Sequence, residues 1–388
     1  MKYPLNIYIV WHADSQISGN IAKELYNSFC RDYEKPLSRG LGIPVYFRFK
    51  KLENEKPIGI DFNNAEKNAV ILLIDEEYFL DDSFTEYTTE ITSKMDNNNR
   101  VYPISLFEKA HTIGCGLSNI QFTIGTIFLE KVLNLQIKED LDKCIKKIKS
   151  EVLHDFARLL LDFHPIYKDK EKDRIGSPVK LFLCHAKHDG EITTIKFKKF
   201  IEQNLKLDVF FDTVDIANGY DFAKQFEEAI LNSALVVFHT DEYSNREWCR
   251  REVLIAKRYK SPIVVAHKIK EGENRAFPYL GNMPTTVLND EDEIEFYKIV
   301  YLTLYQVVNN LYQHRLLLQF KNLKNAGNTM EVITSPPELF NFIDIKRYQK
   351  EIGGKLTILY PDPPIGIEEL SILNEVDPDV FFVTPINL

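Results

Sequence analysis

The residues whose types and spacing could do chemistry are Trp248 and Glu252, four positions apart. In a helix this spacing places both side chains on one face, one turn apart. The carboxylate could meet ribose hydroxyls or the positive charge that grows at an anomeric carbon, and the indole could cover a flat base. A cationic base leaves its ribose as a neutral molecule, so one well-placed carboxylate can suffice. The pair therefore indicates a site for a cationic nucleotide, whereas an isolated helical glutamate is more often simply solvated.

A polar turn that follows an apolar strand supplies the next candidates. The strand and turn run from Lys180 to Gly190 and include His185 and Asp189. In an open α/β sheet, ligands bind beyond the carboxyl ends of the strands. We therefore expect His185 and Asp189 to line the pocket, with a solvated turn that binds nothing as the alternative.

The loop after Phe211 is the third candidate element. It contains Asp212, Asp215 and Gly219, followed by Asp221 at the start of an expected helix. Gly219 permits a backbone turn that a residue with a Cβ atom resists. On its residues alone, the loop is an ordinary polar connection between a strand and a helix, with Asp221 as a helix cap.

Other kinds of site find less support. The ligand types Cys184, His185, His188 and Asp189 lie close together, but their spacing fits no zinc pattern. Cys249 has no histidine in its motif to activate it as a nucleophile. The chain has neither a dinucleotide-binding glycine fingerprint nor a phosphate-binding loop, so a bound nucleotide would be a substrate rather than a redox cofactor.

Length and charge narrow the function classes. The chain has 388 residues and a net charge of −9, which argues against nucleic acid as the main partner. No apolar run is long enough to span a bilayer or to form a secretory signal, so no membrane contact is expected. The 5 cysteines are scattered, as expected of reduced thiols in a cytoplasmic protein.

The chain also repeats itself. The pair His12-Ala13 returns as His185-Ala186, and the helical stretch 158–163 returns as 315–320. Apolar runs such as 69–74 and 234–238 suit parallel strands that are covered on both faces. They alternate with amphipathic stretches, and long helices are expected over 138–163 and 293–323. Chance and shared helical composition are the alternative explanation, but the matches occur in the same order.

These patterns predict an α/β protein with two parallel-sheet domains in tandem. The first domain is expected over residues 1–165, a charged linker over 166–178 and the second domain with its long helix over 179–325. Residues 325–337 form a second candidate linker, and residues 338–388 are expected to form a β-α-β appendage.

Together, the motifs at 180–190, 208–219, 234–244 and 248–252 resemble the Toll/interleukin receptor (TIR) domain family over about residues 179–287. The resemblance implies a flavodoxin-like sheet and an NAD+ glycohydrolase or ADP-ribosyl cyclase with Glu252 as the catalytic residue. NAD+ would be the substrate and no cofactor would be needed. The remaining candidates, Trp248, His185, Asp189, Asp212, Asp215 and Gly219, would contact NAD+.

The resemblance also implies activation by self-association and, for the prokaryotic type, a role in defence against phage with an operon-encoded activator or regulator. Two alternatives stay open: a signalling scaffold that only self-associates, and an enzyme that acts on another nucleotide. The first repeat departs from the pattern, since Glu86 aligns with Trp248 and Glu90 with Glu252. It is expected to be a degenerate TIR-like unit with a sensing, docking or scaffold role.

Overall fold

The computed structural model describes residues 1–34, 40–49, 57–125, 138–163, 177–211, 222–231, 233–273 and 275–388. The chain forms two compact bodies. One contains Lys2–Leu159 with Arg174–Gln306, and the other contains Val307–Leu388 with Leu160–Asp173 and Met1. The first body holds two parallel sheets, and the second holds a smaller sheet.

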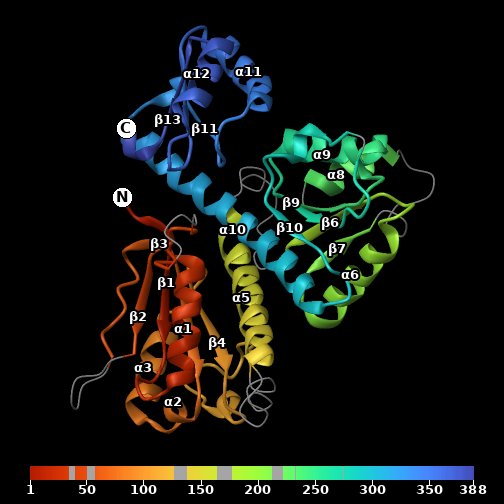
Figure 1. Cartoon of the computed structure of the whole chain (residues 1–388). Helices are drawn as coiled ribbons and strands as arrows, with labels where there is room; N and C mark the ends of the chain where they lie inside the picture. Colours follow the sequence, from red (N-terminus) through yellow and green to blue (C-terminus); the bar gives the residue numbers. More distant parts are fainter. Residues whose placement is uncertain are drawn as a thin grey trace. The chain divides into compact units, whose positions relative to one another are not determined.

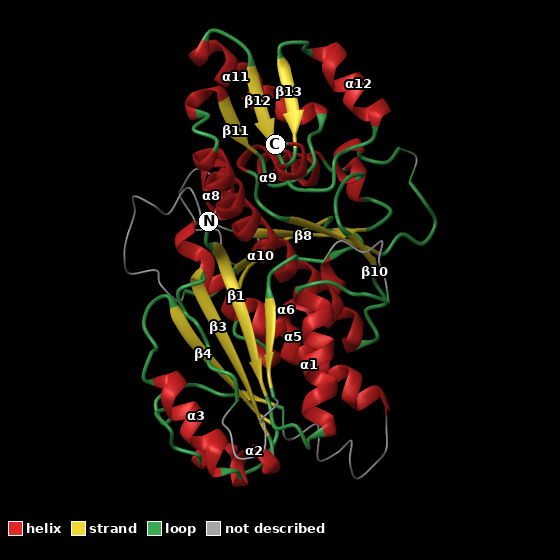
Figure 2. Ribbon diagram, turned by 90° about the vertical axis from the view of Figure 1, so that its left-hand side faces the viewer, coloured by secondary structure: helices red, strands yellow, loops and turns green. Residues whose placement is uncertain are grey.

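The first sheet has five parallel strands in the order β2-β1-β3-β4-β5. They are β1 (Tyr3–Val10), β2 (Val45–Arg48), β3 (Ala65–Ile74), β4 (Asn99–Ser105) and β5 (Thr123–Ile124). Its helices are α1 (Gln16–Phe29), α2 (Glu76–Leu80), α3 (Asp82–Thr92) and α5 (Lys138–Leu160). Figure 2 shows β1, β3 and β4 side by side. We call this part the first α/β unit.

The second sheet repeats this topology. Its parallel strands follow the order β7-β6-β8-β9-β10. They are β6 (Lys180–His185), β7 (Asp208–Phe210), β8 (Ala234–His239), β9 (Ile263–His267) and β10 (Thr285–Val287). Its helices are α6 (Glu191–Asn204), α8 (Phe222–Leu231) and α9 (Glu247–Tyr259), and Figure 1 shows α8 and α9 on one face with α6 on the other. Helix α10 (Glu293–Leu323) begins in this unit and continues from Val307 into the other body. We call this part the second α/β unit.

Both strand orders are those of a flavodoxin-like sheet, in which the second strand of the unit lies at one edge and the first lies beside it. The predicted fold class is therefore confirmed. The central strands contain continuous apolar runs, such as Ala69–Ile74 and Ala234–Phe238, because helices cover both of their faces. In the second unit, Phe226 and Val253 pack on one face, and Phe197 packs against Phe238 on the other at 5.4 Å between ring centroids.

The third sheet has the order β11-β12-β13, with β11 (Met330–Val332), β12 (Leu356–Leu359), β13 (Val380–Val383), α11 (Phe342–Ile352) and α12 (Ile367–Val376). It is larger than the β-α-β appendage expected from the sequence. Strand β11 lies within residues 325–337, where the sequence predicted a linker. The strand was not predicted because three residues are too few to show a periodic pattern.

Short 3₁₀ helices complete the described structure. They are η1 (Ala110–Thr112), η2 (Leu161–Phe163), η4 (Tyr243–Asn245), η5 (Pro278–Leu280), η6 (Gly327–Thr329), η7 (Leu339–Asn341) and η8 (Pro385–Asn387). Residues 166–176, which make up most of the predicted charged linker, lie outside the described residues. Within the ranges given above, every helix is too short or too polar to cross a bilayer.

Helix α5 carries a buried histidine that makes stability depend on pH. His154 Nε2 accepts a hydrogen bond of 3.0 Å from the backbone N–H of Val179. Burial, followed by Arg158 and Lys206, lowers the pKa of His154 to about 3. The unfolded chain therefore binds the extra proton at higher pH, with a pKa of about 6.5. The stability from neutral His154 is complete above that pH and is lost as the pH falls toward the folded value.

We therefore expect His154→Gln to lose less stability in acid than the wild type does. Between pH 6 and 4 the difference in unfolding free energy should shift by about 1.4 kcal/mol per pH unit in favour of the variant. Burial raises the pKa of Asp155 to about 6, which has the opposite sign and masks the effect within the wild type alone. Urea unfolding followed by Trp11 fluorescence in a Trp248→Phe background measures the difference; a constant difference would contradict the prediction.

Candidate active site

The candidate carboxylate, Glu252, lies inside the second α/β unit. Helix α9 buries a stripe made of Cys249, Glu252, Val253 and Ala256, so the acid occupies a position where an apolar residue would also fit. Glu252 is only 6% exposed. Its side chain is within hydrogen-bonding reach of the Cys184 thiol on β6.

The Cys184 thiol and the Tyr243 phenol lie near the Glu252 carboxylate. Cys184 Sγ lies 2.7 Å from Tyr243 Oη, and Tyr243 donates a 3.4 Å hydrogen bond to the carbonyl of Cys249. Burial, the neighbouring Cys249 and the acid Glu252 together raise the pKa of Cys184 well above its ordinary value. The thiol therefore stays protonated and can donate to the carboxylate. These contacts fix α9 against β6 and orient the acid.

Removing one of these groups tests its structural contribution. Tyr243 is fully buried, and Tyr243→Phe leaves the Cys184 thiol and the Cys249 carbonyl without their phenol partner. We expect a loss of about 1–3 kcal/mol in the free energy of unfolding. Trp248 fluorescence in a Trp11→Phe background reports urea unfolding of this unit. The exposed Tyr3→Phe serves as the control and should change stability by less than about 0.5 kcal/mol; equal losses would contradict the assigned role.

Trp248 lies one turn before Glu252 but in a different environment. Its side chain is 44% exposed, and its ring packs against Phe226 of α8 at 6.1 Å between centroids. The Arg251 guanidinium lies over the indole at 4.9 Å from the ring centroid. The indole is thus positioned at the surface, while the carboxylate on the same helix points into the interior.

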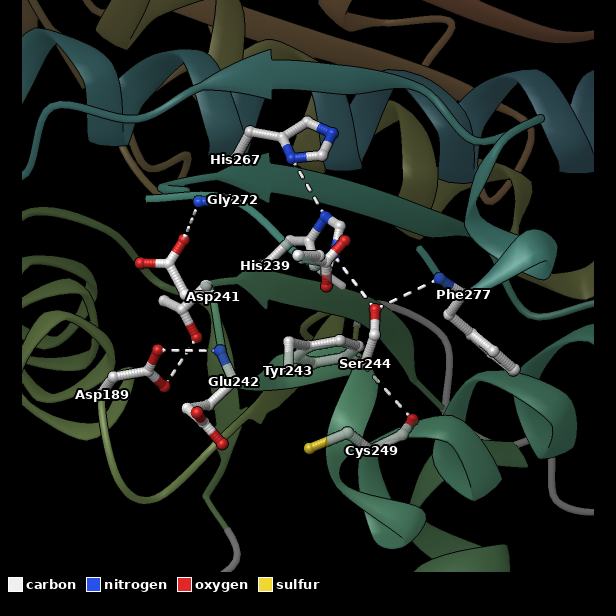
Figure 3. A network of polar contacts seen from close by, with 12 residues as sticks. Asp189, His239, Asp241, Glu242, Tyr243, Ser244, Cys249, His267, Gly272 and Phe277 are labelled. Carbon is white, nitrogen blue, oxygen red and sulfur yellow. Dashed lines mark hydrogen bonds and ion pairs between the residues drawn. The ribbon is translucent and has the colours of Figure 1, made fainter. Parts of the chain in front are cut away.

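His185 and Asp189 both lie at the carboxyl end of β6, but they do different things. The His185 ring is buried and stacks on Phe211 at 5.1 Å and 7°. Its carbonyl accepts a 3.3 Å hydrogen bond from Cys249 Sγ, which brings His185 next to α9. Asp189 instead accepts hydrogen bonds from the Thr240 hydroxyl at 2.8 Å and the Glu242 N–H at 3.1 Å. Both of its oxygens therefore join two strand-end loops (Figure 3).

The loop candidates cannot be placed in the same way. Asp212, Asp215 and Gly219 all lie outside the described residues. Their predicted contacts with a nucleotide remain predictions.

The structure brings together a histidine cluster that the sequence analysis did not single out. His239 Nδ1 lies 3.0 Å from His267 Nδ1, and His239 Nε2 lies 2.8 Å from Glu273 Oε1. Figure 3 shows His239 and His267 at the ends of the adjacent strands β8 and β9, where they are register partners. Burial and the adjacent His239 lower the pKa of His267. The sequence did contain a signal for this cluster. Two successive apolar runs, 234–238 and 263–266, are each followed directly by a histidine.

A second aspartate holds the loop that carries Glu273. Asp241 accepts hydrogen bonds from the backbone N–H groups of Lys270, Glu271 and Gly272 at 3.0–3.2 Å. The Gly272 N–H has the largest effect in lowering the pKa of Asp241. Gly272 has a φ of 113°, a conformation that favours glycine. This turn therefore returns the chain so that Glu273 reaches His239.

The first α/β unit lacks this arrangement of the acid. Glu90, which aligns with Glu252, is exposed and pairs with Lys94 at 3.2 Å. Its buried tyrosine, Tyr78, instead contacts the Thr88 hydroxyl at 2.6 Å. A hydroxyl therefore occupies the interior of the first unit near the tyrosine, where the second unit has a thiol and a carboxylate.

The described part of the second unit thus offers a buried acid, a thiol, three imidazoles and an exposed indole near the carboxyl edge of a parallel sheet. Within the residue ranges described, no group of three or more His, Cys, Asp or Glu side chains is placed to hold a metal ion. The arrangement can supply negative charge to an electron-poor centre and a flat ring for stacking.

Comparison with known proteins identifies one part of the chain. The family model described as "TIR domain" matches residues 181–299. No curated protein matches the chain. A crystal structure of a candidate phosphosugar isomerase from Silicibacter pomeroyi DSS-3 is 9% identical, with 81% of this chain and 87% of that chain covered and a TM-score of 0.20.

Proposed function

Since residues 181–299 belong to the TIR domain family, we propose that this domain cleaves NAD+ between nicotinamide and ribose, with Glu252 as the catalytic residue. The buried Glu252 carboxylate is the observation that carries the proposal. An ionised group in a protein interior loses several kcal/mol of hydration free energy, and an apolar residue at that position would lose none. Such groups cluster at functional sites because the low dielectric strengthens their electrostatic effect.

The proposed reaction uses the acid to stabilise charge. As the bond to nicotinamide lengthens, positive charge grows on the ribose, and the Glu252 carboxylate offsets it. The half-exposed indole of Trp248 stacks on a base of the substrate. Water or a second part of the same molecule then attacks the ribose, which gives ADP-ribose or a cyclic product. Asp212, Asp215 and Gly219 would border the bound nucleotide, and His185 would lie beside it.

The partners form part of the same proposal. The active form would assemble through self-association of TIR domains, with the first α/β unit in a sensing or docking role. An operon-encoded activator would set off assembly in the cytoplasm, and loss of NAD+ would arrest a phage-infected cell. NAD+ would be consumed as a substrate, and no cofactor is proposed.

The test is direct. The full chain at high concentration is incubated with NAD+, and nicotinamide, ADP-ribose and cyclic products are separated by chromatography. Parallel incubations with other nucleotides test the alternative that the enzyme acts on another substrate. Stoichiometric release of nicotinamide supports the proposal. Lack of release at every protein concentration, with and without a crowding agent, would contradict it.

A non-enzymatic scaffold is the second candidate function. Two observations favour it: Glu252 is nearly excluded from solvent, and both Asp189 oxygens already accept hydrogen bonds within the protein. A scaffold would self-associate, as TIR domains commonly do, without consuming NAD+. Light scattering run beside the chromatography separates the two: assembly without nicotinamide release indicates a scaffold.

A further inference from the structure

A cavity of about 250 Å³ lies between elements that the proposed reaction does not use. One wall comes from β4 and the segment that leads into β5, and a second comes from α5. The loop between α6 and β7 and residue Leu304 of α10 close it. All of these residues belong to one compact body of the chain.

The polar lining of this cavity carries an excess of positive charge. Three cations, Arg100, Arg158 and Lys206, face two carboxylates, Glu151 and Asp155. Each carboxylate has a cation nearby, which for Glu151 is Lys147 outside the lining and for Asp155 is Arg158, one of the three cations. Glu151 lies 3.9 Å from Lys147, and Asp155 lies 3.6 Å from Arg158. A local basic surplus is unexpected in a chain whose net charge is −9.

The Arg158 side chain, which lines this cavity, has a buried hydrogen-bond donor without an acceptor among the described residues. This donor is the N–H group at Nε. A buried N–H group without a partner is unfavourable, and an anionic oxygen is the strongest acceptor it could receive. The Nε2 atom of the adjacent His154 is already used to accept the N–H of Val179 and does not serve as this acceptor.

The rest of the lining combines polar residues, such as Gln121 and Ser150, with aromatic and aliphatic ones. Tyr102 and Phe122 contribute aromatic rings, and Leu205, Leu207 and Leu304 contribute aliphatic surface. The Tyr102 ring is held edge-on by Phe156 at 5.9 Å between centroids. A planar base could therefore lie against an aromatic wall while an anionic group reaches the cations. The volume is slightly below the usual range for small-molecule pockets, so the cavity suits one nucleoside with one phosphate and not a dinucleotide.

We propose that this cavity binds a nucleoside monophosphate, with Arg100, Arg158 and Lys206 around the phosphate and Tyr102 and Phe122 beside the base. The ligand differs from the proposed substrate in size, and its site is distinct from the one around Glu252. Because the cavity wall includes β4 and α5 of the first unit and Leu205–Leu207 of the second, a bound nucleotide contacts both units.

The experiment measures binding by calorimetry on the full chain carrying Glu252→Gln, so that turnover cannot interfere. The probes are AMP, GMP, CMP and UMP, with adenosine, inorganic phosphate and NAD+ for comparison. We expect at least one monophosphate to bind at least tenfold more tightly than adenosine, phosphate or NAD+, and its affinity to fall as salt rises.

Substitutions then locate the site. Arg158→Gln and the exposed Lys206→Gln should each weaken binding at least tenfold, whereas Arg347→Gln, an exposed arginine of the C-terminal body, should leave it unchanged. Lys206→Gln keeps the test valid if Arg158→Gln fails to fold. The proposal is wrong if none of the four monophosphates binds, or if folded Lys206→Gln protein binds as tightly as the parent. A negative NAD+ cleavage assay would leave it unaffected.

Discussion

Glu252→Gln is expected to reduce nicotinamide release by at least about 100-fold, as the loss of one preorganised charge-stabilising group does in other enzymes. Glutamine keeps the shape of the side chain but removes its negative charge. The contacts with Cys184 and the packing of α9 should therefore persist while the growing charge on the ribose loses its stabilisation. The rate is measured by chromatography of nicotinamide with substrate above its KM.

The Glu252→Gln experiment needs two controls, one for the folding of the variant and one for the effect of removing a glutamate elsewhere in the chain. Replacing a buried carboxylate with a neutral isostere is not expected to destabilise the fold, so the midpoint of thermal unfolding should not fall. Glu90→Gln makes the matching change on the exposed acid of the first unit and should leave the rate unchanged. Full activity of folded Glu252→Gln protein would remove this residue from the mechanism. Equal losses in both variants would point to a general effect of charge.

Much of the fold was predictable because its signals are local and repeated. Apolar runs such as Ala69–Ile74 and Ala234–Phe238 are buried strands, and the long helix predicted over 293–323 is α10. Parallel strands buried on both faces need such runs, and a repeated order of runs and helices repeats the topology. Strand β11 was missed because Met330–Val332 is too short to show a pattern and is defined by its pairing with β12.

The candidate site was only partly predictable. Helical spacing placed Trp248 and Glu252 on one helix, and the structure keeps them one turn apart. Spacing alone does not specify depth, so it could not tell that the indole is half-exposed and the carboxylate buried. The hydrogen bonds of Asp189 also depend on the loop after β8, more than 50 residues away in the chain. Contacts over such separations follow from the packing of strand ends and leave no local pattern.

The histidine cluster leads to the second large effect. Glu273 and His239 are both buried, with side chains 7% and 5% exposed, and their contact of 2.8 Å joins a loop to the end of β8. His239→Leu should leave the Glu273 carboxylate buried without its imidazole. Breaking a buried pair in this way typically destabilises a protein by about 3–5 kcal/mol. Urea unfolding followed by Trp248 fluorescence in a Trp11→Phe background should show a loss of this size.

A double-mutant cycle measures how much of the lost stability comes from the contact between His239 and Glu273 and how much from the burial of each polar group by itself. Glu273→Leu alone should cost less than His239→Leu, because His239 keeps its bond to His267 at 3.0 Å. In the double variant no carboxylate is left without a partner, so we expect much of the lost stability to return, with a coupling energy above about 1 kcal/mol. His188→Leu, at an exposed histidine in the turn after β6, should change little. Additive losses would mean that the two side chains do not stabilise each other. The histidine cluster would then contribute no stability, and the hydrogen bonds that Asp241 accepts from residues 270–272 would hold the loop in place without it.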